Sequence, residues 1–290
     1  MTSDDLLTVS QFSVSYDVTP PVQAVRDVSL TVRRGEILGL AGESGCGKTT
    51  LAYAIQRLLK PPAVITSGSA VFHDESGEDF DINTMDEAQM RAFRWEKASM
   101  VFQGAMNALN PIITIGAQLQ DVFSTHRPAM KRAERRLESG RLLDLVGVGS
   151  NRLRSYPHEL SGGMRQRVMI AMALALKPQL MIMDEPTTAL DVLVQREIIE
   201  QISELRAEFG FSVIFITHDL PLLLEISDRI AVMREGRIVE IDTARTLYEN
   251  PTHDYTRRLL ASFPSLTGER GGFVRRPDDP ARAAEAGSIR

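Results

Sequence analysis

The sequence has few thiols, few aromatic residues and no long apolar run. Its 290 residues include one cysteine, Cys46, which excludes an internal disulfide and any metal site or cluster built on several thiolates. The longest apolar candidate, residues 168–176, is far shorter than the roughly 18 to 20 residues of a membrane-spanning helix. The opening "MTSDDLLTVS" also lacks the basic and then apolar layout of a signal peptide. These absences predict a chain that stays in the cytoplasm.

The charge balance argues against a general nucleic-acid binder. The formal net charge is −5, which leaves room only for a local basic patch. The Arg-rich stretch 127–141 carries Glu134 and Glu138 at helical spacing, so we interpret it as a solvated helix face. The hydrophobic content of 43% is ordinary for a globular protein, and the length suits one large domain or two modest ones.

The order of strand-like and helix-like segments predicts an α/β fold with a helical insertion. From about residue 112 to 176 the apolar spacing is helical, and strand-like runs disappear. Later strands alternate with amphipathic helices such as 192–209, which indicates a parallel sheet covered on both faces. A short helix is expected after Pro251, and a mobile tail from Ser265. The runs that predict strands are 7–16, 25–32, 36–41, 69–73, 99–102, 180–185, 212–217 and 229–240.

The segment "GESGCGKT", residues 42–49, predicts a phosphate-binding loop. It matches GxxxxGK[ST], follows the apolar strand "EILGLA" and opens a helix, which is the context that this motif requires. Backbone N–H groups of small residues surround phosphates, Lys48 reaches the β and γ phosphates, and the Thr49 hydroxyl ligates Mg²⁺. The Cys46 thiol is interpreted as a small side chain rather than a nucleophile. The candidate binding residues are Gly42, Ser44, Gly45, Cys46, Gly47, Lys48, Thr49 and Thr50.

Polar residues follow three other predicted strands. Asp184 and Glu185 end the run "LMIMDE"; we expect Asp184 to hold Mg²⁺ through water and Glu185 to act as the base for the attacking water, although such a pair can also be a solvated turn. His218 follows the next strand, and we favour a γ-phosphate contact over a cap. Gln103 is either a simple strand end or a contact to the metal or water that reports nucleotide state to the helical insertion. Tyr16 is either a core aromatic or an adenine-stacking platform.

A second candidate phosphate site lies in "LSGGMRQRV", residues 160–168. Ser161 is expected to cap a helix whose first exposed N–H groups favour a phosphate. This site begins more than a hundred residues after the first loop. The sequence therefore offers two candidate phosphate sites within one chain.

The motifs "GESGCGKT", a strand-end glutamine, "LSGG", "LMIMDEP", "ALD" and "TH" occur in this order, and with them the sequence resembles the ATP-binding subunits of ATP-binding cassette (ABC) transporters over about residues 5–262. The resemblance implies a P-loop NTPase core with a mixed sheet, at 1–110 and 177–250, a helical subdomain at 111–176 and a C-terminal helix and tail at 251–290. It also implies ATP and Mg²⁺ as cofactors and a head-to-tail dimer. In that dimer Ser161, Gly162 and Gly163 act on the ATP of a second cassette, and Asp191 links the two sites.

Two further segments, "QGAMNALNP" at 103–111 and "NPTHDYTRRLLASFP" at 250–264, resemble the oligopeptide, dipeptide and nickel importer branch. That branch implies two membrane-spanning permease subunits, an extracytoplasmic substrate-binding protein, no nucleic acid, and a place at the cytoplasmic face of the inner membrane. Oligopeptides or dipeptides are the expected substrates, and nickel and oligosaccharide stay open as alternatives. Many members carry a C-terminal cysteine cluster that is associated with an iron–sulfur centre. This tail has no cysteine, which excludes an iron–sulfur centre here.

Two other functions compete with an importer ATPase. A soluble cassette ATPase acting on nucleic acid or the ribosome usually fuses two cassettes or inserts a long coiled coil, and neither occurs in 290 residues. A metabolic kinase with a P-loop leaves the Ser-Gly-Gly helix unexplained. The energy-coupling subunit of an importer is the favoured interpretation.

Overall fold

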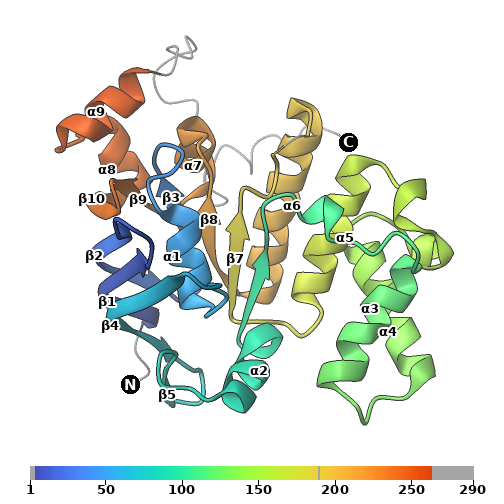
Figure 1. The fold of residues 1–290 in the computed structure, drawn as a ribbon. Coiled ribbons are helices and arrows are strands. Elements are labelled where there is room, and N and C mark those ends of the chain that lie inside the picture. The colour runs from blue at the N-terminus through green and yellow to red at the C-terminus, as the bar shows by residue number, and fades with distance from the viewer. Residues whose placement is uncertain (1–3, 189, 263–290) are drawn as a thin grey trace.

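Two sheets and a lobe of helices make up the fold (Figure 1). The structure is a computed structural model that describes residues 4–188 and 190–262. The tail predicted from Ser265 lies outside the described residues. Within them, no helix has the length and apolar character needed to cross a bilayer.

The larger sheet has six strands and is mixed, as the sequence predicts. Its strands from β9 to β6 are parallel, and only β10 runs antiparallel to its neighbour. The run 229–240, expected as one strand, is a hairpin because Glu235 and Gly236 turn the chain with φ of 48° and 82°. The strand order is β10 (Arg237–Thr243), β9 (Arg229–Arg234), β3 (Ile37–Ala41), β8 (Ser212–Ile216), β7 (Leu180–Asp184) and β6 (Ala98–Val101).

The smaller sheet has four antiparallel strands. Its order is β2 (Val22–Arg33), β1 (Asp5–Tyr16), β4 (Ala63–His73) and β5 (Asp79–Asp81). Helix α1 (Lys48–Ile55) contacts β1 and β2 of this sheet and β7 of the larger one, so it lies between the two sheets. The phosphate loop that precedes α1 is therefore anchored to both sheets.

Between β6 and β7 the described chain is helical, which confirms the predicted insertion. These helices form the lobe that Figure 1 shows on the right. Half of the residues of the Arg-rich helix α4 are exposed, which agrees with the solvated face that its charge pattern predicts. The domain limits at 110 and 177 stay predictions. The insertion contains α3 (Ile115–His126), α4 (Arg132–Leu145) and α5 (Gly162–Leu174), with single turns η1 (Ala105–Asn107), η2 (Ser150–Arg154) and η3 (Pro157–Glu159).

Five more helices lie within the described residues. Helix α6 has the bounds predicted for it, and a helix follows Pro251 as expected. Helix α2 has no counterpart among the predicted elements; it begins with Asp86 and Gln89 in a reciprocal cap. The five are α2 (Glu87–Glu96), α6 (Val192–Phe209), α7 (Leu220–Ile226), α8 (Ala244–Glu249) and α9 (Asp254–Ala261).

The core lies on both faces of the larger sheet. Along β7, Met181 and Met183 pack with the helices of the insertion, while Leu180 and Ile182 pack with α1 and the smaller sheet. Both faces are buried, which explains why β7 reads as a continuous apolar run rather than an alternating one. The carboxyl ends of β3, β7 and β8 share one edge of this parallel sheet, where ligands of such folds bind.

Candidate nucleotide-binding site

Glycines shape the loop between β3 and α1. Gly42 and Gly47 have φ of 149° and 108°, in the region that L-residues with a side chain rarely adopt. A Cβ atom at Gly47 would lie 2.2 Å from the Ala24 carbonyl oxygen, and one at Gly42 would lie 2.2 Å from that of Met233. The Gly236 N–H holds the loop from the other side by donating to the Cys46 carbonyl over 2.9 Å. The loop is therefore fixed by its neighbours in a shape that side chains would prevent.

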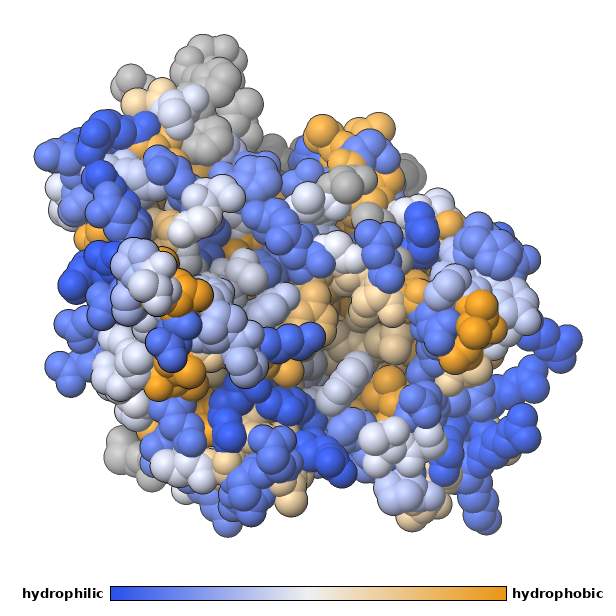
Figure 2. Space-filling view, viewed as in Figure 1, coloured by the Kyte–Doolittle hydropathy of each residue, from blue (hydrophilic) through white to orange (hydrophobic). Residues whose placement is uncertain are grey.

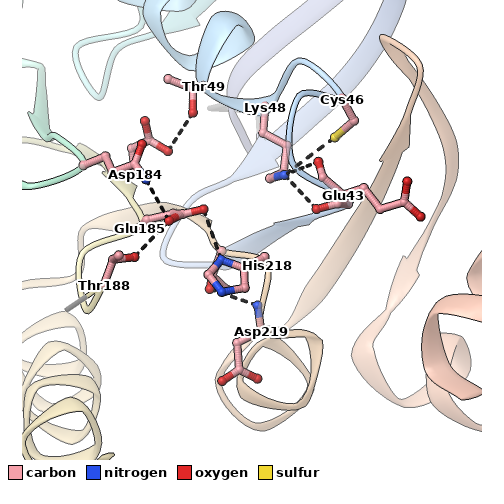
Figure 3. Close-up of polar contacts among 12 residues, drawn as sticks. Glu43, Cys46, Lys48, Thr49, Asp184, Glu185, Thr188, His218 and Asp219 are labelled. Atoms are coloured by element: carbon pink, nitrogen blue, oxygen red, sulfur yellow. Dashed lines mark hydrogen bonds and ion pairs between the residues drawn. The ribbon is translucent and has the colours of Figure 1, made fainter. Parts of the chain in front are cut away.

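Lys48 places a positive charge at this loop. Its side chain is buried, and the Nζ atom donates to the carbonyl oxygens of Gly42 at 2.7 Å and Glu43 at 2.9 Å (Figure 3). None of the ion pairs in the described part of the chain includes Lys48. A buried ammonium group that has only neutral acceptors attracts an anion strongly. Ser44 and Gly45 are exposed at the tip of the same loop, where a phosphate has access.

Thr49 and Asp184 face each other across the start of α1 and the end of β7. The Thr49 hydroxyl donates to Asp184 Oδ1 over 3.1 Å, and Asp184 is fully buried. Burial raises the pKa of the Asp184 carboxyl, and the hydrogen bond from Thr49 opposes that shift. Asp184 Oδ2 is buried with no hydrogen-bond partner among the described residues. An unpartnered carboxylate oxygen beside a hydroxyl is an incomplete set of hard oxygen donors.

This donor set fits Mg²⁺ in particular. No group of three or more His, Cys, Asp or Glu side chains in residues 4–188 and 190–262 could enclose a metal by itself. Mg²⁺ usually takes one or two protein oxygens and completes its shell with water and substrate phosphates. Thr49 and Asp184 are the residues that would hold it.

Glu185 occupies a strained and heavily contacted position. Its φ of 46° is left-handed, which costs a residue with a side chain on the order of 1–3 kcal/mol. Its N–H donates to the Ile216 carbonyl at 2.9 Å. Its Oε2 accepts from Thr188 Oγ1 at 2.9 Å and from Gln103 Nε2 at 3.0 Å, and His218 Nδ1 lies 3.2 Å from Oε1 (Figure 3). Residues that follow β6, β7 and β8 thus converge on the Glu185 carboxylate.

The pKa values of the neighbouring Asp184 and Glu185 carboxyl groups are shifted in opposite directions, upward for Asp184 and downward for Glu185. Burial acts to raise the pKa of Glu185, but the hydrogen bonds from Thr188 and His218 outweigh it, and the pKa is lowered. Glu185 is therefore ionised at neutral pH and able to accept a proton. Opposite shifts in a pair of acids are typical of groups with separate catalytic roles.

The structure brings several predicted site residues together. His218 lies beside Glu185, as the strand order predicts, and Gln103 meets the same carboxylate; their contacts to the γ-phosphate and the metal stay predictions. Tyr16 is half-buried, and its hydroxyl lies 3.4 Å from Thr50 Oγ1, so it borders the loop without deciding between stacking and packing. Sequence reasoning missed Thr188, which only its spacing of three residues from Glu185 could have indicated.

The signature segment lies apart from the phosphate loop. Ser161 caps α5 through its side chain, and Asp191 caps α6 by accepting from the Val194 N–H at 3.0 Å. A Cβ at Gly163 would lie 2.5 Å from Val194 Cγ1, so the first turns of α5 and α6 are in contact at this glycine. The neighbouring Gly162 is half-exposed. Among the described residues no hydrogen bond or ion pair joins Ser161–Gly163 to residues 42–50. The second phosphate site is not part of the first within one chain.

Comparison with known proteins assigns the family. Residues 25–188 match the family described as "ABC transporter". This chain belongs to the ABC transporter family. Residues 239–288 match a second family, "Oligopeptide/dipeptide transporter, C-terminal region"; the match begins within β10 and covers α8 and α9. The resemblance drawn from the motifs, its importer branch included, is confirmed.

Two curated ABC relatives show how far the likeness extends. The oligopeptide transport ATP-binding protein of Salmonella typhimurium is 43% identical, over 95% of this chain and 81% of its own. The glutathione import ATP-binding protein of the same organism is 40% identical over 96% of this chain, but the chain spans about half the length of this relative, 46%. A solved structure, described as the dimer of a bacterial ABC transporter cassette, has a TM-score of 0.72 at 28% identity. It covers 83% of this chain and 99% of that one, which confirms the predicted ABC ATPase fold.

Proposed function

We propose that this chain binds and hydrolyses ATP as the energy-coupling subunit of an importer for short peptides. The observation that carries the proposal is the convergence of Lys48, the Thr49–Asp184 pair and the ionised Glu185 at one edge of the sheet. The relatives are named for oligopeptide and glutathione transport, which favours peptides over nickel or oligosaccharide. The same names favour an importer over the nucleic-acid or ribosome alternative.

In the proposed reaction, Lys48 and the loop N–H groups bind the phosphates and orient the terminal one. When bound, Mg²⁺ neutralises phosphate charge as it develops. Glu185 orients a water molecule for attack on the γ-phosphorus and accepts its proton. As the water oxygen bonds to the γ-phosphorus, the bond from that phosphorus to the bridging oxygen breaks, and the oxygen leaves with ADP. Gln103 and His218 hold the Glu185 carboxylate in place through the hydrogen bonds described above.

A second cassette completes the proposed site. Ser161 and Asp191 are exposed and lie at helix starts, so their free faces suit the ATP and the loop of another chain. Beside Asp191, Val192 and Leu193 are 79% and 76% exposed and form an apolar patch at the upper end of α6 (Figure 2). Apolar side chains this exposed are typical of contact surfaces. Another solved structure, 27% identical with a TM-score of 0.71, is described as a dimeric cassette bound to ADP and Pi.

The proposed importer also needs membrane partners. We place the chain at the cytoplasmic face of the inner membrane, peripheral to two permease subunits that receive substrate from an extracytoplasmic binding protein. The helical insertion would bind a short cytoplasmic helix of a permease. Ile112 and Ile113, adjacent apolar residues that are 81% and 39% exposed before α3, are the side chains that such a helix would cover.

Uptake in cells tests the proposal. Deleting the gene should abolish uptake of labelled di- and tripeptides, and the parent chain should restore it while Lys48→Ala should not. Loss of nickel uptake with intact peptide uptake would reassign the substrate. Copurification with RNA or ribosomes instead of hydrophobic subunits would overturn the importer itself.

A further inference from the structure

The C-terminal helix α9 is fastened to the phosphate loop. Tyr255, in its first turn, is 4% exposed, and its hydroxyl accepts a hydrogen bond from the Glu43 N–H at 3.1 Å. The Arg234 guanidinium lies over the Tyr255 ring, 5.1 Å from its centroid, and holds the ring by a cation–π contact. Glu43 is the second residue of the phosphate loop. Figure 1 shows α9 on the same side of the fold as β3 and α1.

Helix α9 is itself held in place, so it can act as a support. Glu240 on β10 accepts from the Thr252 N–H at 2.7 Å and its hydroxyl at 2.9 Å, and from the His253 N–H at 3.1 Å. The His253 ring then caps α9 by accepting from the Tyr255 N–H at 3.1 Å. These contacts leave the Tyr255 ring little freedom to move away from the loop.

Both backbone polar groups of Glu43 make hydrogen bonds. Its N–H donates to Tyr255, and its carbonyl oxygen accepts from Lys48 Nζ at 2.9 Å. The Glu43 N–H also lies in one planar peptide unit with the Gly42 carbonyl, which accepts from Lys48 Nζ at 2.7 Å. The hydroxyl therefore helps to set the orientation of a carbonyl that holds the Lys48 ammonium. A cavity of about 350 Å³ lies between the loop and α9, so within residues 4–188 and 190–262 no other side chain fills this space to replace the hydroxyl if it is removed.

We propose that Tyr255 is a positioning residue of the ATP site, through which helix α9 holds the phosphate loop in its nucleotide-binding shape. The inference rests on the proposed ATPase function. Without this hydrogen bond the loop samples other shapes, and ATP binding must supply the ordering. The expected signature is a weaker affinity for ATP with an unchanged chemical step, since the hydrogen bonds of Asp184 and Glu185 include neither Tyr255 nor Glu43.

The test uses the full chain and Tyr255→Phe, which keeps the ring and removes only the acceptor. Titration with a fluorescent ATP analogue should give an affinity lower by roughly two- to tenfold, the range expected for one neutral hydrogen bond. The KM for ATP should rise by the same factor, while kcat stays within about twofold. The control is Tyr248→Phe, which changes an exposed tyrosine on α8 and should match the parent.

Each outcome decides between positioning and packing. An ATP affinity equal to that of the parent, with or without a lower Tm, would mean that Tyr255 only packs α9, and would overturn the inference; so would a fall in kcat at constant KM. If Tyr255→Phe does not fold, Glu240→Ala, which loosens the start of α9, should weaken ATP binding in the same way, and parent-like binding there would also refute it. A parent chain that binds no ATP would instead refute the proposed function.

Discussion

Replacing Glu185 with glutamine should nearly abolish ATP hydrolysis and leave ATP binding intact. The site can accept the amide without rearrangement. The carbonyl oxygen of the glutamine side chain has two lone pairs, which can accept from the Thr188 hydroxyl and the Gln103 amide. The NH₂ group of the glutamine can donate to His218 Nδ1 when that nitrogen carries no proton. What the substitution removes is the negative charge that accepts the proton of the attacking water.

The size of the effect follows from this loss. A positioned general base contributes about 10²- to 10⁴-fold in rate, or about 2.7–5.4 kcal/mol of barrier. The Thr49–Asp184 pair is untouched. Glu185 also raises the pKa of Asp184 through charge repulsion, although less than burial does, so its neutralisation favours the ionised form of Asp184 that suits a metal. Tight ATP binding without turnover should accumulate an ATP-bound dimer.

Phosphate release measures turnover, and gel filtration with ATP and Mg²⁺ measures dimerisation. Glu208→Gln, which changes an exposed glutamate on α6 by the same chemistry, is the matched control and should behave as the parent. A Glu185→Gln chain that hydrolyses ATP at close to the parent rate would remove Glu185 from its role as base. Loss of ATP binding would assign it to the architecture of the site.

Three further substitutions and one pH series test the other assignments. Lys48→Ala should weaken ATP binding by about 1.5–3 kcal/mol, because a charged donor to the phosphates is lost, and calorimetry showing unchanged affinity would contradict this. Tyr16→Ala should cost about 1–3 kcal/mol if the ring stacks on adenine; unchanged affinity with a lower Tm would return it to the core. Ser161→Arg should leave ATP binding to the monomer intact but block ATP-driven dimerisation; a photoreactive ATP analogue that labels residues 42–50 and 161–163 within one dilute monomer would refute the trans arrangement. Because the folded-state pKa of Glu185 is lowered from 4.5, its ionised form stabilises the fold above that pH, and urea unfolding of parent and Glu185→Gln should differ less as pH falls through the folded-state pKa. A difference that does not change with pH would contradict the shift.

The parts of the fold that the sequence predicts well are those with local signals. The loop at 42–49 is rich in glycine and follows an apolar strand, so the sequence alone locates it. Helix 192–209 has regular apolar spacing after the capping residue Asp191, and its bounds could be predicted to the residue. The hairpin at 229–240 could not, because apolar residues continue on both sides of a turn of only two residues. The three-residue strand β5 carries too short a pattern to detect.

The residues of the site also divide into those with a local sequence signal and those without one. Asp184, Glu185 and His218 follow apolar strands, and the order of parallel strands brings them to one edge. The contact between Tyr255 and Glu43 joins residues 212 positions apart, and no local pattern encodes it. Tyr255 lies in a segment that resembles an importer branch, but the resemblance did not indicate what its hydroxyl touches.

The left-handed backbone of Glu185 has a consequence for how this sequence can evolve. Glycine and asparagine adopt φ near 46° at less cost than glutamate, so either would relieve the local strain. Glycine would also lose the hydrogen bonds from Thr188 and Gln103, so selection for thermal resistance weighs the strain against these bonds, whereas selection for ATP hydrolysis would keep the acid. Position 185 is therefore one where stability and turnover select for different residues.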